Sequence, residues 1–292
     1  MALRGKRLMP EALENYVQAG KVARKIRETF KDKVKEGKKV LEFCEELEAD
    51  ILSLGASLAF PCNVGINQVA AHFTPVPSDE LEFGPTDLVK VDYGLHIDGY
   101  IVDTAFTVPL SRNDSKLVET TELALKEVTR STKVGDRISK IGAIVASIAK
   151  SNSFKIIENL QGHEIERYKL HSGVSISNVP NFNIRKLQEG MVLAIEPFLT
   201  YGFGAGRVEE TNVVNILQLP RDLKLVSKEL TDAFDNLPLC KRWLNRLSLS
   251  IPSNVEKRMK AYPVLIEANG APVAQAETTL VLLRDQTIDL LI

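Results

Sequence analysis

The chain has 292 residues, of which 44% are hydrophobic and 26% charged, an ordinary composition for a globular protein. Its formal net charge of −1 does not indicate a polyanionic partner such as a nucleic acid. Its three cysteines are far apart and odd in number, so no disulfide framework can be read from them, which fits a reducing cytosol. Met1–Pro10 lacks a secretory signal, and no apolar stretch reaches the roughly 20 residues that span a bilayer. We therefore expect a cytoplasmic, soluble protein with one domain over residues 1–292.

The N-terminal part of the chain predicts two helices. Glu11–Glu36 has apolar residues at helical spacing and ends before Gly37. Its acidic and basic residues alternate, which favours a solvated helix face over contact with nucleic acid. Leu41–Leu54 predicts the second helix, which ends before Gly55. The following stretch, AFPCNVGINQVAAHFTPVP, is rich in Pro, Asn and Gly, so we expect a loop and a short strand there.

Leu88–Pro109 is the clearest hairpin, with β-forming residues on both arms and Asp98-Gly99 near its tip. Two amphipathic helices are then expected over Asp114–Val134 and Ile138–Lys150. Short strands should surround His163 and occupy the segments MVLAIEPF and VAQAETTLVLL.

Residues 206–263 are interpreted as an insertion into the domain, within which Arg221–Asn245 has a helical pattern. No sequence repeat relates the two halves of the chain. Short, locally paired strands with helices between them indicate an α+β domain.

Asp92 and Asp103 lie on opposite arms of the predicted hairpin. A loop at 97–98 would place the two carboxylates opposite each other, with Cβ atoms roughly 4.5–5.5 Å apart. A loop at 98–99 would make them diagonal neighbours on the same face, and only an odd-length loop would separate them.

Apolar neighbours indicate that this pair of carboxylates is largely buried. Two ionised carboxylates would then repel each other, and each would lose several kcal/mol of hydration. Either one stays protonated, as in an acid protease, or cations neutralise both. The hairpin alone does not decide between these options and two solvated aspartates on an edge strand.

Three further segments carry polar groups in apolar surroundings: His163, Glu196 and Glu277. Each of them taken singly is more often a structural residue. Together with the two aspartates they supply four acids and one imidazole, a ligand set whose charge two divalent cations would balance. Such ligands suit Mn, Fe(II), Co or Zn, and no cysteine has the spacing of a structural zinc site.

The other histidines are less informative. His72 lies in a loop-like stretch among apolar residues and is a candidate proton carrier, whereas His96 at the hairpin tip is expected to be exposed. If the chain were fully extended, His163 and His171 would be roughly 26 Å apart. They share a site only if the chain turns between them.

The segments VDYG, IVDTAFTV, GHEIERYKLHSG, AIEPF and AQAETTL resemble, in order and spacing, the five metal-binding segments of methionine aminopeptidases. The resemblance extends from Leu13 to Leu283. The stretch between Glu196 and Glu277 resembles the helical insertion of the type II enzymes, and the short N-terminal segment resembles the archaeal form. The implied fold is the α+β pita-bread fold, with two pseudo-symmetric halves around a central pocket.

The resemblance also implies a role for each matching residue. Asp103 and Glu277 would bridge two metal ions, Asp92 would complete the shell of one, and His163 and Glu196 would complete that of the other. The remaining matches are to substrate-contacting positions: His72 and His171 at the scissile amide, and Phe60 and Leu170 around the methionine side chain. One departure is Thr278, next to Glu277, where several relatives have His.

The implied reaction is removal of the N-terminal methionine from nascent polypeptides, by attack of a metal-bridged hydroxide on the scissile carbonyl. Glu196 would act as the proton shuttle. We expect a monomer whose partners are nascent N-termini, with docking on the ribosome left open, and no specific nucleic acid or membrane.

Three other classes of protein share some of these features. An Xaa-Pro aminopeptidase or prolidase shares the fold, but such relatives usually carry an extra N-terminal domain, and only about 90 residues precede Asp92. A non-catalytic binding protein of the same fold would lack several ligands, whereas all five are present. An aspartic-type hydrolase would require Asp-Thr-Gly segments, which the chain lacks.

Overall fold

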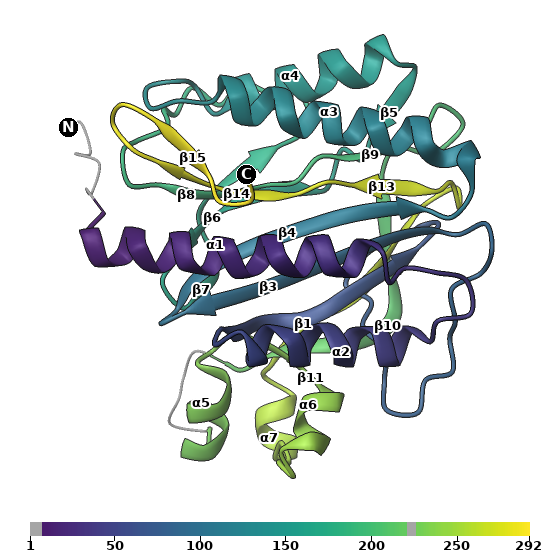
Figure 1. The fold of residues 1–292 in the computed structure, drawn as a ribbon, viewed down its shortest axis with the longest axis vertical. Helices are drawn as coiled ribbons and strands as arrows, with labels where there is room; N and C mark the ends of the chain where they lie inside the picture. The colour runs from purple at the N-terminus through teal and green to yellow at the C-terminus, as the bar shows by residue number, and fades with distance from the viewer. Residues whose placement is uncertain (1–7, 221–225) are drawn as a thin grey trace.

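The computed structural model describes residues 8–220 and 226–292. In this part of the chain, helices pack around four antiparallel sheets (Figure 1). Helices α3 and α4 lie together along the top of the view, α1 crosses in front of β3 and β4, and α5, α6 and α7 gather at the bottom. No described helix is both long enough and apolar enough to cross a membrane.

The first half of the molecule combines α1 (Pro10–Lys31) and α2 (Val40–Ser53) with a sheet in the order β1-β3-β4. Both predicted helices are confirmed, although α1 ends five residues before the predicted Glu36. Its buried side chains recur at helical spacing and pack on the sheet, where the Tyr93 hydroxyl donates to the Ala23 carbonyl at 2.7 Å. This packing forms the first hydrophobic core.

The prediction of a loop and short strand after α2 is wrong for its first part, because β1 is a full strand over Ser57–Ile66. It is confirmed for its second part, where the short strand β2 (Val69–Ala71) is followed by a loop at 72–76. Pro61 is tolerated because the pairing of β1 with β3 shifts register between Phe60 and Asn63. At such an irregularity the missing proline N–H breaks no ladder hydrogen bond.

The hairpin is confirmed as β3 (Leu88–Ile97) and β4 (Tyr100–Pro109). Its loop is Asp98-Gly99, with φ values of 49° and 80°, as a tight two-residue turn requires. Asp92 therefore pairs with Ala105 while Asp103 pairs with Gly94, so the two carboxylates are diagonal neighbours on one face.

The prediction that His96 is exposed is wrong. Its side chain is buried, its Nδ1 accepts a hydrogen bond from the Gly99 N–H at 3.0 Å, and its ring meets the edge of Tyr168. The hairpin tip is covered by a second turn that the sequence does not reveal.

The second half packs α3 (Ser115–Ser131) and α4 (Ser139–Ser151) on strands from the middle and end of the chain, and both predicted helices are confirmed. One sheet has the order β15-β14-β8-β6-β7 and another β13-β9-β5. The strands are β5 (Phe154–Ile156), β6 (Gln161–Glu166), β7 (Lys169–Ser177), β8 (Val192–Ile195), β9 (Phe198–Tyr201), β13 (Val273–Gln275), β14 (Thr278–Leu282) and β15 (Thr287–Asp289).

The segment predicted as an insertion begins with β10 (Val208–Gln218), which pairs with β12 (Lys260–Glu267) in a sheet of order β11-β10-β12-β2. Between these two strands lie α5 (Lys228–Phe234), β11 (Pro238–Cys240), α6 (Lys241–Arg246) and α7 (Ser253–Glu256), which share a small core of their own.

The prediction of one helical segment over Arg221–Asn245 is wrong for those of its residues that the structure describes. Its first residues, 221–225, lie outside the described part. Two consecutive left-handed residues, Asp235 and Asn236, end α5, and Pro238 then begins β11. Residues 206–263 as the limits of an insertion remain a prediction.

Candidate active site

A cavity of about 130 Å³ lies where the two halves and the β10–β12 segment meet. It is lined by every residue that the sequence singled out for a site: Phe60, His72, Asp92, Asp103, His163, Leu170, His171, Glu196 and Glu277. These residues span more than 200 positions of the chain, so folding brings them together. Their individual roles remain predictions.

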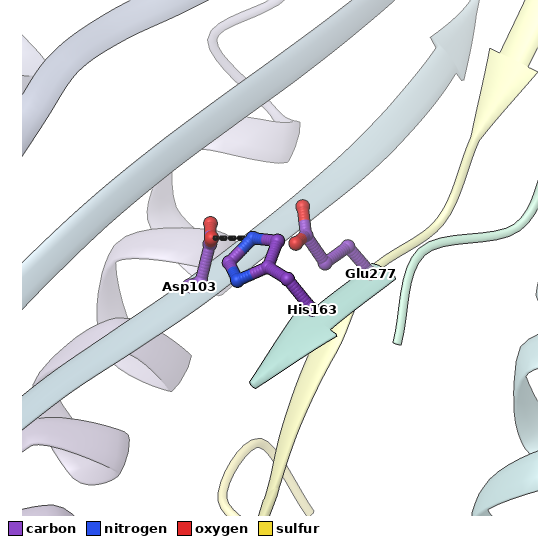
Figure 2. A group of neighbouring side chains, drawn as sticks. All are labelled: Asp103, His163 and Glu277. Carbon is purple, nitrogen blue, oxygen red and sulfur yellow. Dashed lines mark ion pairs between the residues drawn. The ribbon is translucent and has the colours of Figure 1, made fainter. Parts of the chain in front are cut away.

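Three of these side chains converge from three different segments (Figure 2). Asp103 on β4, His163 on β6 and Glu277 just before β14 each offer a ligand atom, and these atoms lie within 4.8 Å of one another. His163 Nε2 is 3.3 Å from an Asp103 oxygen and 3.7 Å from a Glu196 oxygen. The imidazole thus faces two carboxylates at once.

Side-chain and backbone hydrogen bonds join the two halves directly beneath this cluster. The Thr279 hydroxyl donates to the Asp103 carbonyl at 2.8 Å and accepts from the Asp103 N–H at the same distance. Thr104 donates to the Glu277 carbonyl at 2.9 Å, and the Glu277 N–H donates to the Ala105 carbonyl at 3.0 Å. Asp103 and Glu277 are therefore fixed relative to each other by their own backbones.

The electrostatics of the cavity are unfavourable without a cation. Burial raises the pKa of Asp92, Glu196 and Glu277 well above the usual range, and the negative charge of Asp103 raises all three further. Among the described residues that line the cavity, there is no Lys or Arg to offset four carboxylates.

The donor set fits divalent metal ions. Asp92 Oδ1 and His163 Nδ1 are buried and have no hydrogen-bond partner among the described residues, although buried polar atoms normally have one. Four carboxylates and one imidazole match cations with oxygen and nitrogen preference. A cation at Asp92 would satisfy its unpartnered oxygen, and the same ions would offset the charge.

The β6–β7 hairpin brings His163 and His171 together, because the chain reverses at Arg167-Tyr168, where Tyr168 has a φ of 53°. The two ring centroids are 4.3 Å apart. Of the two geometries that the sequence left open, the chain therefore adopts the turn. Burial lowers the pKa of His171 to about 2, and the neighbouring His163 contributes to this shift.

His72 has an unusual backbone, with a φ of 66°, a conformation that non-glycine residues adopt rarely and often at functional sites. Its Nδ1 lies 3.0 Å from the Pro263 carbonyl, which can only accept, so Nδ1 carries the proton and Nε2 of the neutral ring is an acceptor. Burial lowers the pKa of His72, which keeps the ring neutral.

Several lining residues were missed by the sequence analysis. Tyr262 on β12 stacks on His171 with ring centroids 6.1 Å apart and meets His72 edge-on at 5.4 Å. Its place within the predicted insertion gave no signal of a site. Other missed residues add apolar and amide surface: Asn63, Ala71, Leu160, Gln161, Phe198, Ile216 and Pro238.

Comparison with known proteins identifies the class. The profile of metallopeptidase family M24 matches residues 14–215, and the chain belongs to this family of metal-dependent hydrolases. A methionine aminopeptidase of Methanocaldococcus jannaschii is 39% identical over 285 residues, which cover 93% of this chain and 96% of that protein. One from Archaeoglobus fulgidus is 39% identical over 279 residues, covering 93% and 95%. Within the family, the chain therefore belongs with the archaeal methionine aminopeptidases.

Solved structures confirm the pita-bread fold. Methionine aminopeptidase of Thermotoga maritima has a TM-score of 0.75 at 19% identity, with 98% of this chain and 99% of that one covered. A thermophilic Arx1 has a TM-score of 0.81 at 17% identity, covering 97% and 91%. The prolidase of Pyrococcus furiosus has a TM-score of 0.61, and the match covers only 64% of that chain. The predicted fold and family are confirmed, and the prolidase alternative is not favoured.

Proposed function

We propose that this chain removes the N-terminal methionine from newly made polypeptides, using two divalent metal ions. The observation that carries the proposal is the convergence of four carboxylates and one imidazole in a single buried cavity. Asp103 and Glu277 would bridge the ions, Asp92 would complete one shell, and His163 and Glu196 the other. When bound, such ions polarise a carbonyl and lower the pKa of a water molecule toward neutrality. Co, Mn, Fe(II) and Zn all suit these ligands.

The chain's own residues then bind the substrate and move protons. Glu196 is half-buried in the cavity, 3.7 Å from His163 Nε2, where a carboxylate held at the ions can receive a proton and pass it on. The neutral His72 presents an acceptor nitrogen for the substrate amide N–H, and His171, held between His163 and Tyr262, lies next to the same site.

The methionine side chain would occupy the apolar part of the cavity. Phe60 and Leu170, which line the cavity together with Phe198, Ile216 and Pro238, would form this part. Gly94 is required beside it, because any side chain there would overlap the Phe60 ring. An apolar pocket distinguishes similar side chains by only about 1–3 kcal/mol, so slow cleavage of other unbranched residues is expected.

Residues 206–263 would then be the type II insertion, since β11 and β12 of this segment supply Pro238 and Tyr262 to the cavity. Nascent polypeptides as substrates imply a cytoplasmic location, and a cavity complete within one chain implies that a monomer suffices.

The test uses purified protein with Met-Ala-Ser and Ala-Pro peptides. We expect cleavage of the methionine peptide, loss of activity after removal of metal with EDTA, and recovery with Co or Mn. Elemental analysis of gently purified protein should give two metal ions per chain. Cleavage of the proline peptide alone would overturn the specificity, and full activity of protein shown to be metal-free would overturn the mechanism.

A further inference from the structure

A buried ion pair lies outside the cavity and is not used by the proposed mechanism. Glu48 on α2 and Arg242 on α6 have side-chain exposures of 0% and 3%. Both guanidinium Nη atoms donate to the carboxylate, each at 2.9 Å, in the bidentate geometry that gives the strongest pairing. The pair joins the first half of the molecule to the segment between β10 and β12.

Both members of the pair also make hydrogen bonds to other groups. Glu48 accepts from the Cys62 N–H at 3.1 Å and from Trp243 Nε1 at 2.8 Å. Arg242 donates to the Pro75 carbonyl at 2.9 Å and to the Thr74 hydroxyl at 2.8 Å. Three separate segments, β1, residues 74–75 and α6, thus meet α2 at one pair of charges.

Each of these segments includes or lies close in sequence to a residue that lines the cavity. Cys62 lies between Phe60 and Asn63 on β1, and both of these line the cavity. Thr74 is two residues beyond His72, and its hydroxyl donates to the Cys62 carbonyl at 2.8 Å. Arg242 follows β11, which contributes Pro238 to the cavity. A displacement of the ion pair would therefore reach the cavity walls over one to four residues of chain.

Stability alone does not explain a buried ion pair, since well-packed apolar residues often stabilise a core equally well. Charged hydrogen bonds are directional, so they can also hold a backbone in one position. Such a constraint matters for β1, because its pairing with β3 loses register between Phe60 and Asn63 and so does not fix the backbone at Cys62. The hydrogen bond from Cys62 to Glu48 replaces the missing constraint.

We propose that Glu48 and Arg242 form a positioning pair that sets the shape of the substrate pocket by holding Phe60, His72 and Pro238 in one arrangement. The inference rests on the proposed function for the identity of the substrate, but not for the placement of the walls. Neither residue touches the substrate, so both act through the segments that they hold.

The test compares metal-loaded Arg242→Lys and Trp243→Phe with wild type. Lysine keeps the charge but cannot reach Glu48, Thr74 and Pro75 together, and phenylalanine removes one donor to Glu48. Misplaced walls weaken ground-state binding, so KM for Met-Ala-Ser should rise about 10-fold in Arg242→Lys and about 3-fold in Trp243→Phe, with kcat within about 2-fold. The control is Lys241→Gln, an exposed neighbour on the same helix, which should behave as wild type.

A merely structural role predicts a different result: less folded protein, hence lower apparent kcat, with KM unchanged. That pattern in both variants would overturn the proposal, and Trp243→Phe decides it if Arg242→Lys does not fold. Crystal structures provide a readout independent of activity, with Phe60 or Pro238 expected to shift by more than about 0.5 Å. Superimposable cavity walls would likewise overturn the positioning role, whereas a wild type that cleaves no methionine peptide would overturn only the proposed function.

Discussion

Among individual residues, Asp103 acts on each of the other three carboxylates of the cavity. Its charge contributes to the raised pKa of Asp92, Glu196 and Glu277, and its carboxylate is the nearest to His163. Its main-chain atoms are held separately, by Thr279. The side chain can therefore be neutralised without disturbing the backbone that carries it.

We expect Asp103→Asn to lower kcat/KM at least about 100-fold, because losing a metal ligand should cost more than losing a group that only orients a ligand. The fold should be retained, and the metal-free variant should be more stable than metal-free wild type, since one charge has left a repulsive cluster. Steady-state kinetics, elemental analysis and thermal unfolding check these points, with the exposed Asp285→Asn as control. An active variant with unchanged metal content would contradict the bridging role.

At the scale of elements, the site depends on two hairpins whose turns lock together. β3–β4 carries the two aspartates and β6–β7 carries His163 and His171. The Tyr168 N–H donates to the Gly99 carbonyl at 2.8 Å, and Arg167 Nε donates to the Asp98 carbonyl at the same distance. The register between the hairpins therefore fixes the histidines against the carboxylates.

Gly99→Ala should break this contact. Gly99 has a φ of 80°, and an added methyl group would overlap the Tyr168 ring. We expect a loss of more than about 1 kcal/mol of unfolding free energy and weaker metal binding, measured by thermal unfolding and metal titration. Gly37→Ala is the matched control, because Gly37 has a φ of 77° but open space around it. Equal losses in both variants would show that the turns do not hold the site together.

For the whole molecule, patterns local in sequence were predicted well. The four N-terminal and central helices and the β3–β4 hairpin follow from apolar spacing and turn residues, because those signals act within one element. The region after Gly206 was not predicted well, since its short helices and strands are defined by packing on each other. Strand β1 was not predicted either, because its pairing with β3 is irregular.

The site divides in the same way. Its ligand set was predicted because buried acids stand out in apolar strands and because the five segments match a known family. The position of Tyr262 and the contact between His163 and His171 were not predicted, because both depend on how distant strands are placed. The buried Glu48 and Arg242 are nearly two hundred positions apart, so no local pattern connects them.

The stability of the whole metal-free protein should depend on the carboxylate cluster. Burial raises the folded-state pKa of Asp92, Glu196 and Glu277, so the folded protein holds protons that the unfolded chain releases above about pH 4. This contribution to stability is fully present at low pH and is lost as the pH rises through the raised folded-state pKa.

The comparison is between EDTA-treated wild type and the double variant Asp92→Asn/Glu196→Gln, which cannot titrate at these positions. As the pH rises from about 4 to about 8, the Tm of wild type should fall relative to that of the variant, by roughly 2–4 °C for each kcal/mol lost. Divalent cations should prevent this fall in the Tm of wild type and leave the Tm of the variant unchanged, because they neutralise the ionised carboxylates directly. A Tm difference that stays constant over this range, or widens toward low pH, would mean that these acids are not the buried, mutually repelling groups on which the metal site depends.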